Sequence, residues 1–369
     1  MIGGTSEKPI RVLCCLRLDR MAATGRYRSY QYFPYLQQHG FEIDVFQLLS
    51  DKYLPERFAT GRRSAMHVVP GYVRRWLRFR RCDYDLLWTE KEAFPWIPWW
   101  IEALSLPKAI PYVADYDDAW FHRYDANEHA LVRFLLGRKI DCVMRGAAMV
   151  VAGNAYIADR ARQAGARRVE LLPTVVDLDR YPVVPPPRNE VFTIGWIGSP
   201  MTAQLLRWVQ PALREVCRRG PTRLVAIGAG PLELEGVPVE VRPWSEETEV
   251  RDMQDFDVGI MPLSDTPMSR GKCGLKLIQY MACCRPVVGT PVGVNSEIIQ
   301  HGVDGFQATT TEQWVEALEK LRADAALRKQ MGQAGQKIVE ERYSLSVGAP
   351  RLAGLLRAAA VLPQQKLPK

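Results

Sequence analysis

Three cations lie beside the start of the helix that we expect over residues 275–284: Arg270, Lys272 and Lys276. Positive side chains next to a helix N-terminus are unfavourable on their own, because the helix dipole is positive at that end. They become favourable when a polyanion binds there, because the polyanion interacts both with the cations and with the helix dipole. Gly271 and Gly274 also allow close approach of the backbone. The segment predicts an anion-binding site, and the alternative is a solvated basic loop.

A glycine turn supplies a second candidate anion site. Gly198 ends an expected strand and Ser199 opens a helix, so free backbone N–H groups and the helix dipole suit a phosphate there. The alternative is an ordinary helix N-cap. Gly228 and Gly230 follow the next strand, but a dinucleotide fingerprint needs a third glycine where Glu233 stands. The sequence therefore argues against NAD binding.

Carboxylates gather at the end of a strand expected over residues 111–116. Asp115 and Asp117 have one residue between them, so on a strand their side chains share a face. The two carboxylates could hold a metal that bridges a diphosphate. The alternative is that they cap the next helix or pair with arginines. Asp118 and His122 follow closely, and the histidines of the chain show no metal-binding spacing.

Gly25, Arg26 and Arg28 open the first expected helix, directly after a strand expected over residues 11–16. In a parallel sheet, the carboxyl ends of the strands face the crevice where ligands bind. These three residues are therefore candidates to line that crevice. The alternative is a helix start with solvated arginines.

Eight arginines fall between residues 57 and 81, with no lysine and no acidic residue, and they equal the whole net charge of +8. On a helical wheel, apolar residues oppose basic ones over the second half of this stretch. A basic amphipathic helix with aromatic residues suits an anionic membrane surface. The alternative is a helix that packs on the sheet with a solvated face. The residues expected to contact the membrane are Arg74, Arg75, Trp76 and Arg78.

Short apolar strands alternate with helical segments along the chain, which predicts an α/β protein with parallel sheets. The 369 residues are 47% hydrophobic and 24% charged, which excludes disorder as the dominant state. Residues 181–190 are rich in proline and are predicted to form a linker. We therefore expect domains at 1–185 and 186–343, with a ligand cleft between them, and a C-terminal helix and tail at 344–369.

Cysteine usage and hydropathy argue against other classes of protein. The eight cysteines include no C-x-x-C and suggest neither a disulfide framework nor a zinc site, which favours a cytoplasmic setting. We expect no signal peptide, and no apolar run reaches the roughly 18 residues of a membrane span. The basic residues lack a recognised nucleic-acid module, so no nucleic-acid partner is expected.

The run from Pro262 to Gly293, continued by residues 298–306, resembles the nucleotide-sugar site of family 4 glycosyltransferases. The N-terminal half is similar to the same family at residues 25–28, 112–118, 151–158 and 172–177. The resemblance implies the GT-B fold, in which two Rossmann-like domains face each other across a cleft and a C-terminal helix returns to the first domain. It also implies a retaining enzyme that needs no metal.

The chain departs from the family pattern at the donor site. The family commonly carries a Glu-x7-Glu pair, and Gly271 and Gln279 stand in those positions. Its usual Arg and Lys are replaced around Ser199 and Gln204, so we expect the cations near residue 272 to hold the diphosphate instead. Gln279 can still bind a ribose hydroxyl, and Trp244 would border the base. The expected donor-site residues are Gly198, Ser199, Gly228, Trp244, Arg270, Lys272, Cys273, Gly274, Lys276 and Gln279.

The resemblance implies sugar transfer from a nucleotide-diphosphate sugar to a hydroxyl of a sugar, lipid-linked or protein acceptor. Such a reaction would serve the synthesis of surface polysaccharide, glycolipid or another glycoconjugate, with no metal or other cofactor and with peripheral attachment to the inner face of the cell membrane. The alternatives are a non-catalytic nucleotide-sugar-binding or scaffold protein, favoured by Gly271, and an isomerase or phosphorylase. The candidate catalytic residues are Asp117, Asp118 and His122, and those expected to face the acceptor are Gly25, Arg26 and Arg28.

Overall fold

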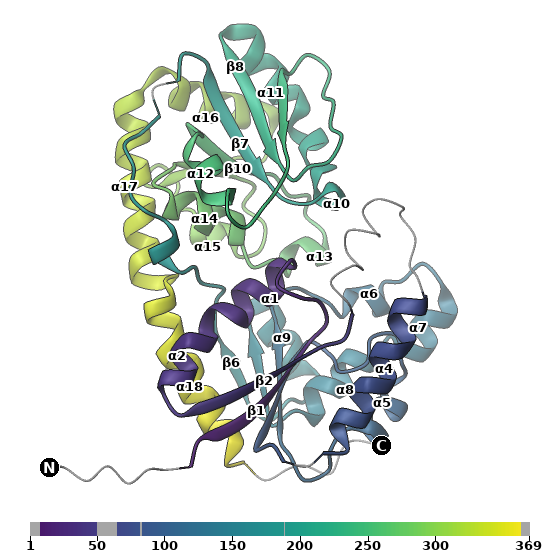
Figure 1. Cartoon of the computed structure of the whole chain (residues 1–369). Helices are drawn as coiled ribbons and strands as arrows, with labels where there is room; N and C mark the ends of the chain where they lie inside the picture. Colours follow the sequence, from purple (N-terminus) through teal and green to yellow (C-terminus); the bar gives the residue numbers. More distant parts are fainter. Residues whose placement is uncertain (1–7, 50–64, 82, 188, 363–369) are drawn as a thin grey trace, which may run out of the picture. The chain divides into compact units, whose positions relative to one another are not determined.

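The chain folds into two compact α/β units (Figure 1). The first unit is residues 1–173 together with 348–369, and the second is residues 174–347. The domain boundary that we expected between residues 185 and 186 lies further along the chain than this division. The computed structural model describes residues 8–49, 65–81, 83–187 and 189–362.

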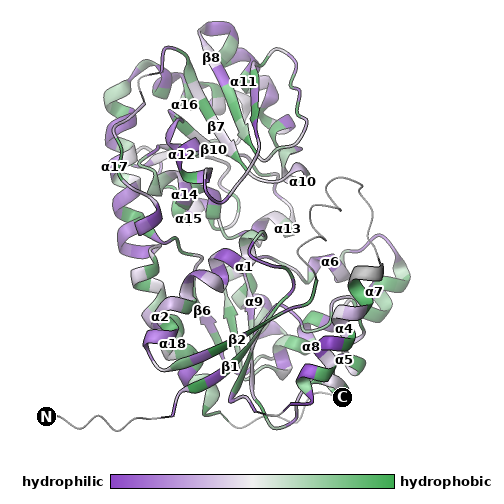
Figure 2. Ribbon diagram, in the orientation of Figure 1, coloured by the Kyte–Doolittle hydropathy of each residue, from purple (hydrophilic) through white to green (hydrophobic). Residues whose placement is uncertain are grey.

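A six-stranded parallel sheet forms the centre of the first unit, with the strand order β2-β1-β3-β4-β5-β6. Every residue of β3, β4 and β5 is buried, as parallel strands covered on both faces require. Figure 2 shows that hydrophobic residues dominate the central strands. The sequence predicts the first five strands, and the sixth is too short to give a pattern. The strands are β1 (Ile10–Leu16), β2 (Phe41–Gln47), β3 (Leu86–Glu90), β4 (Tyr112–Tyr116), β5 (Met149–Ala152) and β6 (Val169–Leu171).

The helix expected from residue 27 to residue 38 is broken into short pieces. Pro34 stands in the first turn of α2, and a proline cannot continue a preceding helix because it lacks the N–H group and its ring clashes with the earlier turn. The described helices of the first unit are α1 (Ala23–Arg28), η1 (Tyr30–Tyr32), α2 (Phe33–Gln38), α4 (Ala65–Phe79), α5 (Trp99–Ser105), α6 (His122–Asp125), α7 (Ala130–Leu136), α8 (Lys139–Gly146), α9 (Ala155–Gln163) and α18 (Leu345–Ala360).

Helix α18, at the end of the chain, packs on the first unit, as the GT-B prediction requires. Arg351 donates a hydrogen bond of 2.9 Å to the carbonyl oxygen of Leu171. Arg357 donates one of 2.9 Å to the carbonyl oxygen of His39. These contacts join the last helix to both edges of the sheet region.

The second unit has its own six-stranded parallel sheet, with the order β12-β11-β10-β7-β8-β9. Its strands are β7 (Phe192–Ile197), β8 (Thr222–Ile227), β9 (Val239–Arg242), β10 (Val258–Met261), β11 (Val287–Gly289) and β12 (Gly305–Gln307). Its described helices are η2 (Leu178–Arg180), α10 (Pro200–Ala203), α11 (Leu206–Arg219), α12 (Glu249–Gln254), α13 (Pro267–Arg270), α14 (Leu275–Ala282), α15 (Asn295–Ile298), α16 (Thr311–Ala323) and α17 (Ala325–Arg342).

Helix α4 buries Arg75 and Phe79 together, so its inward side is neither the apolar side nor the basic side of the helical wheel. Arg78 pairs with Asp44 of β2 and is mostly buried. Arg75 is fully buried, so the prediction that it contacts a membrane is wrong. Its guanidinium donates hydrogen bonds to three main-chain carbonyl oxygens, those of Leu16, Phe46 and Ala93. Buried carbonyl groups thus hold the arginine inside the domain.

Several apolar residues of α4 are exposed to solvent. Val69, Val73 and Leu77 are 60%, 52% and 54% exposed, and of the expected membrane contacts Arg74 and Trp76 are exposed. None of the described helices has the length and hydropathy needed to cross a membrane. Three arginines of the basic stretch lie outside the described residues: Arg57, Arg62 and Arg63.

Candidate functional site

The cationic segment lies at the start of α14, which is fixed against the end of β7. Gly274 is the N-cap residue and has a φ of +70°, a left-handed conformation that suits glycine. A side chain there would also clash, since a Cβ would lie 2.3 Å from Ile298 Cδ1. Further along the helix, the hydroxyl of Tyr280 accepts a hydrogen bond of 2.9 Å from the N–H of Ile197, the last residue of β7.

Lys276 lies in the first turn of α14, and its ammonium group reaches the end of β7. Its Nζ is 4.2 Å from the ring centroid of Trp196, a cation–π contact. A Cβ on Gly198 would lie only 2.8 Å from the same atom. Burial, together with repulsion from Lys272, lowers the pKa of Lys276 to about 7.

In the described part of the chain, no carboxylate forms an ion pair with Lys276. A cation removed from water without a partner is destabilising, and an anion bound beside it relieves that cost. Lys276 is therefore the residue of the predicted donor site that most clearly requires an anionic ligand.

The turn after β7 meets the end of β8. A Cβ on Gly228 would lie 2.4 Å from the carbonyl oxygen of Gly198, so the two glycines pack together. The N–H of Gly198 donates to the carbonyl oxygen of Ile227 (3.0 Å), and the N–H of Ser199 donates to Thr202 Oγ1 (3.2 Å). Both N–H groups expected to bind a phosphate are thus already used. Ser199 acts as the N-cap of α10, which was the alternative interpretation.

Arg270 is held by a carboxylate at the surface. Its Nε lies 2.7 Å from Asp265 Oδ1, and its Nη2 lies 3.0 Å from Asp265 Oδ2. Both side chains are about half exposed, and an exposed pair of this kind is weak enough to exchange for a better anion. Lys272 and Cys273, between Arg270 and α14, are partly exposed.

Gln279 and Trp244 are each bonded to a neighbouring side chain. Gln279 is 4% exposed, and its amide donates a hydrogen bond of 3.3 Å to the hydroxyl of Tyr181. Trp244 donates from Nε1 to Glu249 Oε2 at 2.8 Å. A Cβ on Gly228 would lie 3.0 Å from the Cβ of Trp244, so this indole lies near the ends of β7 and β8. The structure brings Trp244 to the anion site and buries Gln279 against Tyr181.

In the first unit, the aspartates at the end of β4 turn to different cations. Asp115 Oδ1 accepts a hydrogen bond of 2.9 Å from Arg28 Nε. Asp117 Oδ1 lies 2.8 Å from Lys91 Nζ, and its Oδ2 accepts one of 2.6 Å from the Thr24 hydroxyl. Burial acts to raise the pKa of Asp117, but Lys91, Thr24 and Arg28 together outweigh it and the net pKa is lowered. Pairing with cations, one of the two interpretations of this motif, is what the structure contains.

The two carboxylates therefore do not converge on a common point. Among the residues that the structure describes, no three His, Cys, Asp or Glu side chains are grouped so as to hold a metal ion.

Arg26 and Arg28 were expected to face an acceptor, but both are buried in the first unit together with Gly25. Besides its pair with an aspartate, Arg28 donates a hydrogen bond of 2.7 Å to the carbonyl oxygen of Leu172. Arg26 donates one of 3.0 Å to the carbonyl oxygen of Arg20. These bonds make the two arginines positioning residues that fix the turns at the end of the sheet.

Of the three predicted catalytic residues, His122 and Asp118 are partly exposed and Asp117 is buried. Both ring nitrogens of His122 are engaged. Its Nδ1 lies 2.9 Å from Asp125 Oδ1, and its Nε2 lies 2.8 Å from the Tyr156 hydroxyl. The imidazole is therefore held in one orientation near the end of β4.

The sequence analysis missed a cluster of cations around Trp120. The ring centroid lies 4.3 Å from Arg123 Cζ, 4.7 Å from Arg17 Cζ and 4.8 Å from Lys91 Nζ. Lys91 also has a φ of +65°, an uncommon backbone conformation for a residue with a side chain. Arg17 and Lys91 directly follow β1 and β3, which are adjacent strands. Their positions after expected strands were the only signal in the sequence.

Comparisons with known proteins agree with this architecture. Residues 191–324 match the family model described as "Glycosyl transferases group 1". Alpha-D-kanosaminyltransferase from Streptomyces kanamyceticus is 25% identical over 254 residues, which are 64% of this chain and 63% of that protein. The match thus spans less than two thirds of that relative.

Two solved structures have a similar fold over nearly the whole chain. Sucrose-phosphate synthase from Thermosynechococcus elongatus aligns with a TM-score of 0.67 at 13% identity, covering 95% of this chain and 99% of that chain. Alr3699/HepE from Anabaena, solved in complex with UDP-glucose, aligns with a TM-score of 0.65 at 16% identity, covering 95% and 100%. At such identities the likeness establishes the fold alone.

Two α/β units with parallel sheets, matched by these structures over nearly the whole chain, identify the GT-B fold class. Within that fold class, the match to the model of group 1 glycosyltransferases covers residues 191–324, which lie in the second unit.

The lowered pKa of Lys276 predicts how nucleotide affinity depends on pH. With a pKa of about 7, Lys276 loses its proton as the pH rises from 7 to 9, and a bound diphosphate would have to restore it. The dissociation constant of UDP should therefore rise by up to about tenfold per pH unit. Over this range the diphosphate of UDP keeps nearly the same charge, since the second phosphate pKa is about 6. Isothermal titration calorimetry measures the dissociation constant.

Two variants control this measurement. Lys276→Met should bind UDP weakly and without the pH dependence. Lys337→Met, at a lysine that is 75% exposed in α17, should keep the slope of the unmodified protein. A flat profile in the unmodified protein would contradict a role for Lys276 in binding the diphosphate.

Proposed function

We propose that the protein transfers a sugar, with retention, from a nucleotide-diphosphate sugar to the hydroxyl of an acceptor. The observation that carries this proposal is the ammonium of Lys276, on a half-buried side chain, which forms no ion pair with a carboxylate in the described chain and lies against Trp196 at the end of β7. It belongs to a domain of the group 1 glycosyltransferase family. The Anabaena relative was solved with UDP-glucose, which supports a nucleotide sugar as the donor.

The chemistry needs charge stabilisation more than a protein nucleophile. As the sugar–oxygen bond breaks, the sugar becomes oxocarbenium-like and the leaving diphosphate gains negative charge. Lys276 and Lys272 would stabilise that charge, and the position of Lys276 is set before the reaction by α14. Arg270 would leave Asp265 to join them. The acceptor hydroxyl then attacks the same face of the sugar, and the protein holds the two substrates together.

Asp118 and His122 are the residues of the first unit proposed to act near the acceptor hydroxyl. Both are partly exposed, and His122 is oriented by Asp125 and Tyr156. Asp117 instead holds Lys91 and is proposed as a positioning residue. We place the reaction in the synthesis of a surface polysaccharide or glycolipid, because the first unit offers an apolar outer face described below.

The direct test is an assay of nucleotide release with a panel of nucleotide sugars. Free nucleotide should form only when an acceptor is present, and the new linkage should keep the anomeric configuration of the donor in an NMR spectrum of the product. Lys276→Met should lower kcat/KM at least about tenfold, the loss expected when a charge-stabilising group is removed.

Three results would contradict the proposal. Nucleotide binding without transfer to any acceptor would favour a non-catalytic binding protein. Equal release with and without acceptor would indicate another reaction of the sugar nucleotide. Inverted configuration in the product would exclude retention.

We also propose that transfer is independent of metal ions. In other enzymes a divalent metal neutralises the leaving diphosphate, and here Lys272, Lys276 and Arg270 would supply that charge. Turnover should therefore be unchanged in EDTA, measured as initial rates of nucleotide release. Full loss of activity that manganese restores would show that the cations of the chain are insufficient.

We further propose that the first unit attaches peripherally to an anionic membrane through its outer helices. Leu104 of α5 and Phe134 of α7 are 73% and 84% exposed, and Val73 of α4 is 52% exposed. Helix α8 packs against both α5 and α7, so these helices are neighbours. Arg74 and Arg133 are exposed beside the apolar residues and suit anionic head groups.

The membrane proposal predicts the effect of replacing the exposed apolar residues. The double variant Leu104→Ser, Phe134→Ser should bind vesicles of anionic phospholipid at least about tenfold more weakly in a sedimentation assay. Full burial of each side chain contributes about 1.5–3 kcal/mol, and 1.4 kcal/mol is tenfold.

The matched control is the double variant Met201→Ser, Trp208→Ser in the second unit, where the side chains are 62% and 68% exposed. It should bind vesicles as tightly as the unmodified protein. An equal loss in both double variants would mean that no particular face docks on the membrane.

A further inference from the structure

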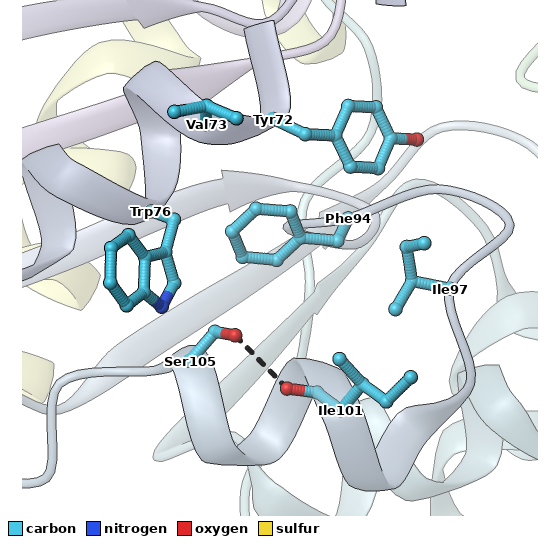
Figure 3. A pocket seen from close by; sticks show the side chains of 7 residues that line it. All are labelled: Tyr72, Val73, Trp76, Phe94, Ile97, Ile101 and Ser105. Atoms are coloured by element: carbon cyan, nitrogen blue, oxygen red, sulfur yellow. Dashed lines mark hydrogen bonds between the residues drawn. The ribbon is translucent and has the colours of Figure 1, made fainter. Parts of the chain in front are cut away.

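A groove in the first unit lies between α4 and α5 and is lined almost entirely by hydrocarbon (Figure 3). Its volume is about 230 Å³. The hydroxyl of Ser105 donates a hydrogen bond of 3.0 Å to the carbonyl oxygen of Ile101, and the hydroxyl of Tyr72 donates one to the carbonyl oxygen of Pro95. Both hydroxyl groups are thus used within the domain. The lining residues are Tyr72, Val73, Trp76, Phe94, Ile97, Ile101 and Ser105.

This lining suits a hydrocarbon chain better than a peptide. A peptide would bring N–H and carbonyl groups that need hydrogen bonds, and the bonded hydroxyl groups of the groove do not offer them. A hydrocarbon chain needs only apolar contact and gains from leaving water. With a volume of about 230 Å³, the groove accommodates one hydrocarbon chain rather than a bilayer surface.

A second pocket adjoins the groove and leads to the carboxyl ends of the strands. Its volume is about 70 Å³, and Tyr72 lines both spaces. Arg17, which directly follows β1, lines the second pocket. Its remaining lining residues are Leu48, Leu49, Val68, Pro95 and Trp96. An apolar space and a cationic one therefore meet at a single side chain.

Arg17 supplies positive charge at this end. In the described residues its guanidinium forms no ion pair with a carboxylate, and it lies 4.7 Å from the ring centroid of Trp120. Lys91 and Arg123 approach the same ring. Only the main-chain N–H of Arg17 is bonded to an acid, Glu90 Oε2 at 3.0 Å. A guanidinium held on an aromatic ring in this way is available for a phosphate.

We infer that the acceptor is an amphiphile, with a hydrocarbon chain in the groove between α4 and α5 and an anionic, phosphate-bearing head group at Arg17. This inference rests on the proposed function and names the class of its second substrate. Outside the groove the same two helices carry other exposed apolar residues, among them Leu77 and Leu104. A lipid could therefore pass from a membrane into the groove while its head group lies at the strand ends, where Asp118 and His122 also lie.

Alkyl phosphates test this inference without an assay of transfer. Decyl phosphate below its micelle concentration should bind the full-length protein, and binding should weaken as the alkyl chain is shortened to hexyl and ethyl. Inorganic phosphate and decanol should each bind at least about tenfold more weakly than decyl phosphate, because each retains only one of the two contacts. Isothermal titration calorimetry measures all five affinities.

Variants then separate the two contacts. Ser105→Phe and, as a second way to fill the groove, Val73→Phe should each weaken decyl phosphate at least about tenfold and leave inorganic phosphate unchanged. Arg17→Gln should weaken decyl phosphate until it binds no better than decanol. Leu104→Ser, on the outer side of α5, is the matched control and should leave decyl phosphate binding unchanged.

Affinity for UDP, measured on every variant, reports that the donor site in the second unit is intact, and thermal unfolding followed by circular dichroism reports that both units are folded. Unchanged decyl phosphate binding in both groove-filling variants would overturn the inference, as would equal affinity for decyl phosphate and decanol in the unmodified protein. A protein that binds decyl phosphate as described but transfers no sugar would retain this site and lose the proposed function.

Discussion

The desolvated ammonium of Lys276 is the constraint on which the rest of the second unit depends. It is held above Trp196 by a helix that Tyr280 bonds to the last residue of β7. A carboxylate at this point would remove the cost of burying the charge, and the described chain provides none. The rigidity of α14 keeps the ammonium group in place despite the free-energy cost of its desolvation, and a bound anion offsets that cost. A site of this kind is ready for an anion before the anion arrives, which is the form of preorganisation that stabilises a leaving diphosphate.

In the first unit, by contrast, buried charged side chains form ion pairs. Arg28 pairs with Asp115, Lys91 pairs with Asp117, and Lys139 lies between Glu92 and Glu102 at 2.6 Å and 2.9 Å. Such pairs add little net stability, but removal of one partner is costly. They fix the turns that follow β3 and β4, and so they determine which cations are left for a ligand. Among the cations at the ends of these strands, Arg17 rests on a ring rather than on a carboxylate.

The sequence predicted the parts of the fold that depend on local pattern. Buried strands such as β4 and β7 have apolar runs, and Gly274 marks the left-handed start of α14. The errors concern residues whose roles depend on distant partners. The outward face of α4 could not be foreseen, because Arg75 is buried by the carbonyl groups of Leu16, Phe46 and Ala93, which the fold brings together. For the same reason the cluster around Trp120 was invisible, since its members come from three separate segments.

The orientation of α4 changes the interpretation of the basic stretch at residues 57–81. The terminal nitrogens of Arg75 bond three carbonyl groups inside the domain, so the helix can bury this arginine while Val69, Val73 and Leu77 stay exposed. The exposed side chains of Val69, Val73 and Leu77 then add no stability to the protein in water. Beside hydrocarbon they do stabilise the protein through apolar contact. The same helix forms one wall of the groove, and the adjoining pocket contains Arg17. A single orientation of α4 thus accounts for the exposed apolar surface, the apolar groove and the position of its cationic end.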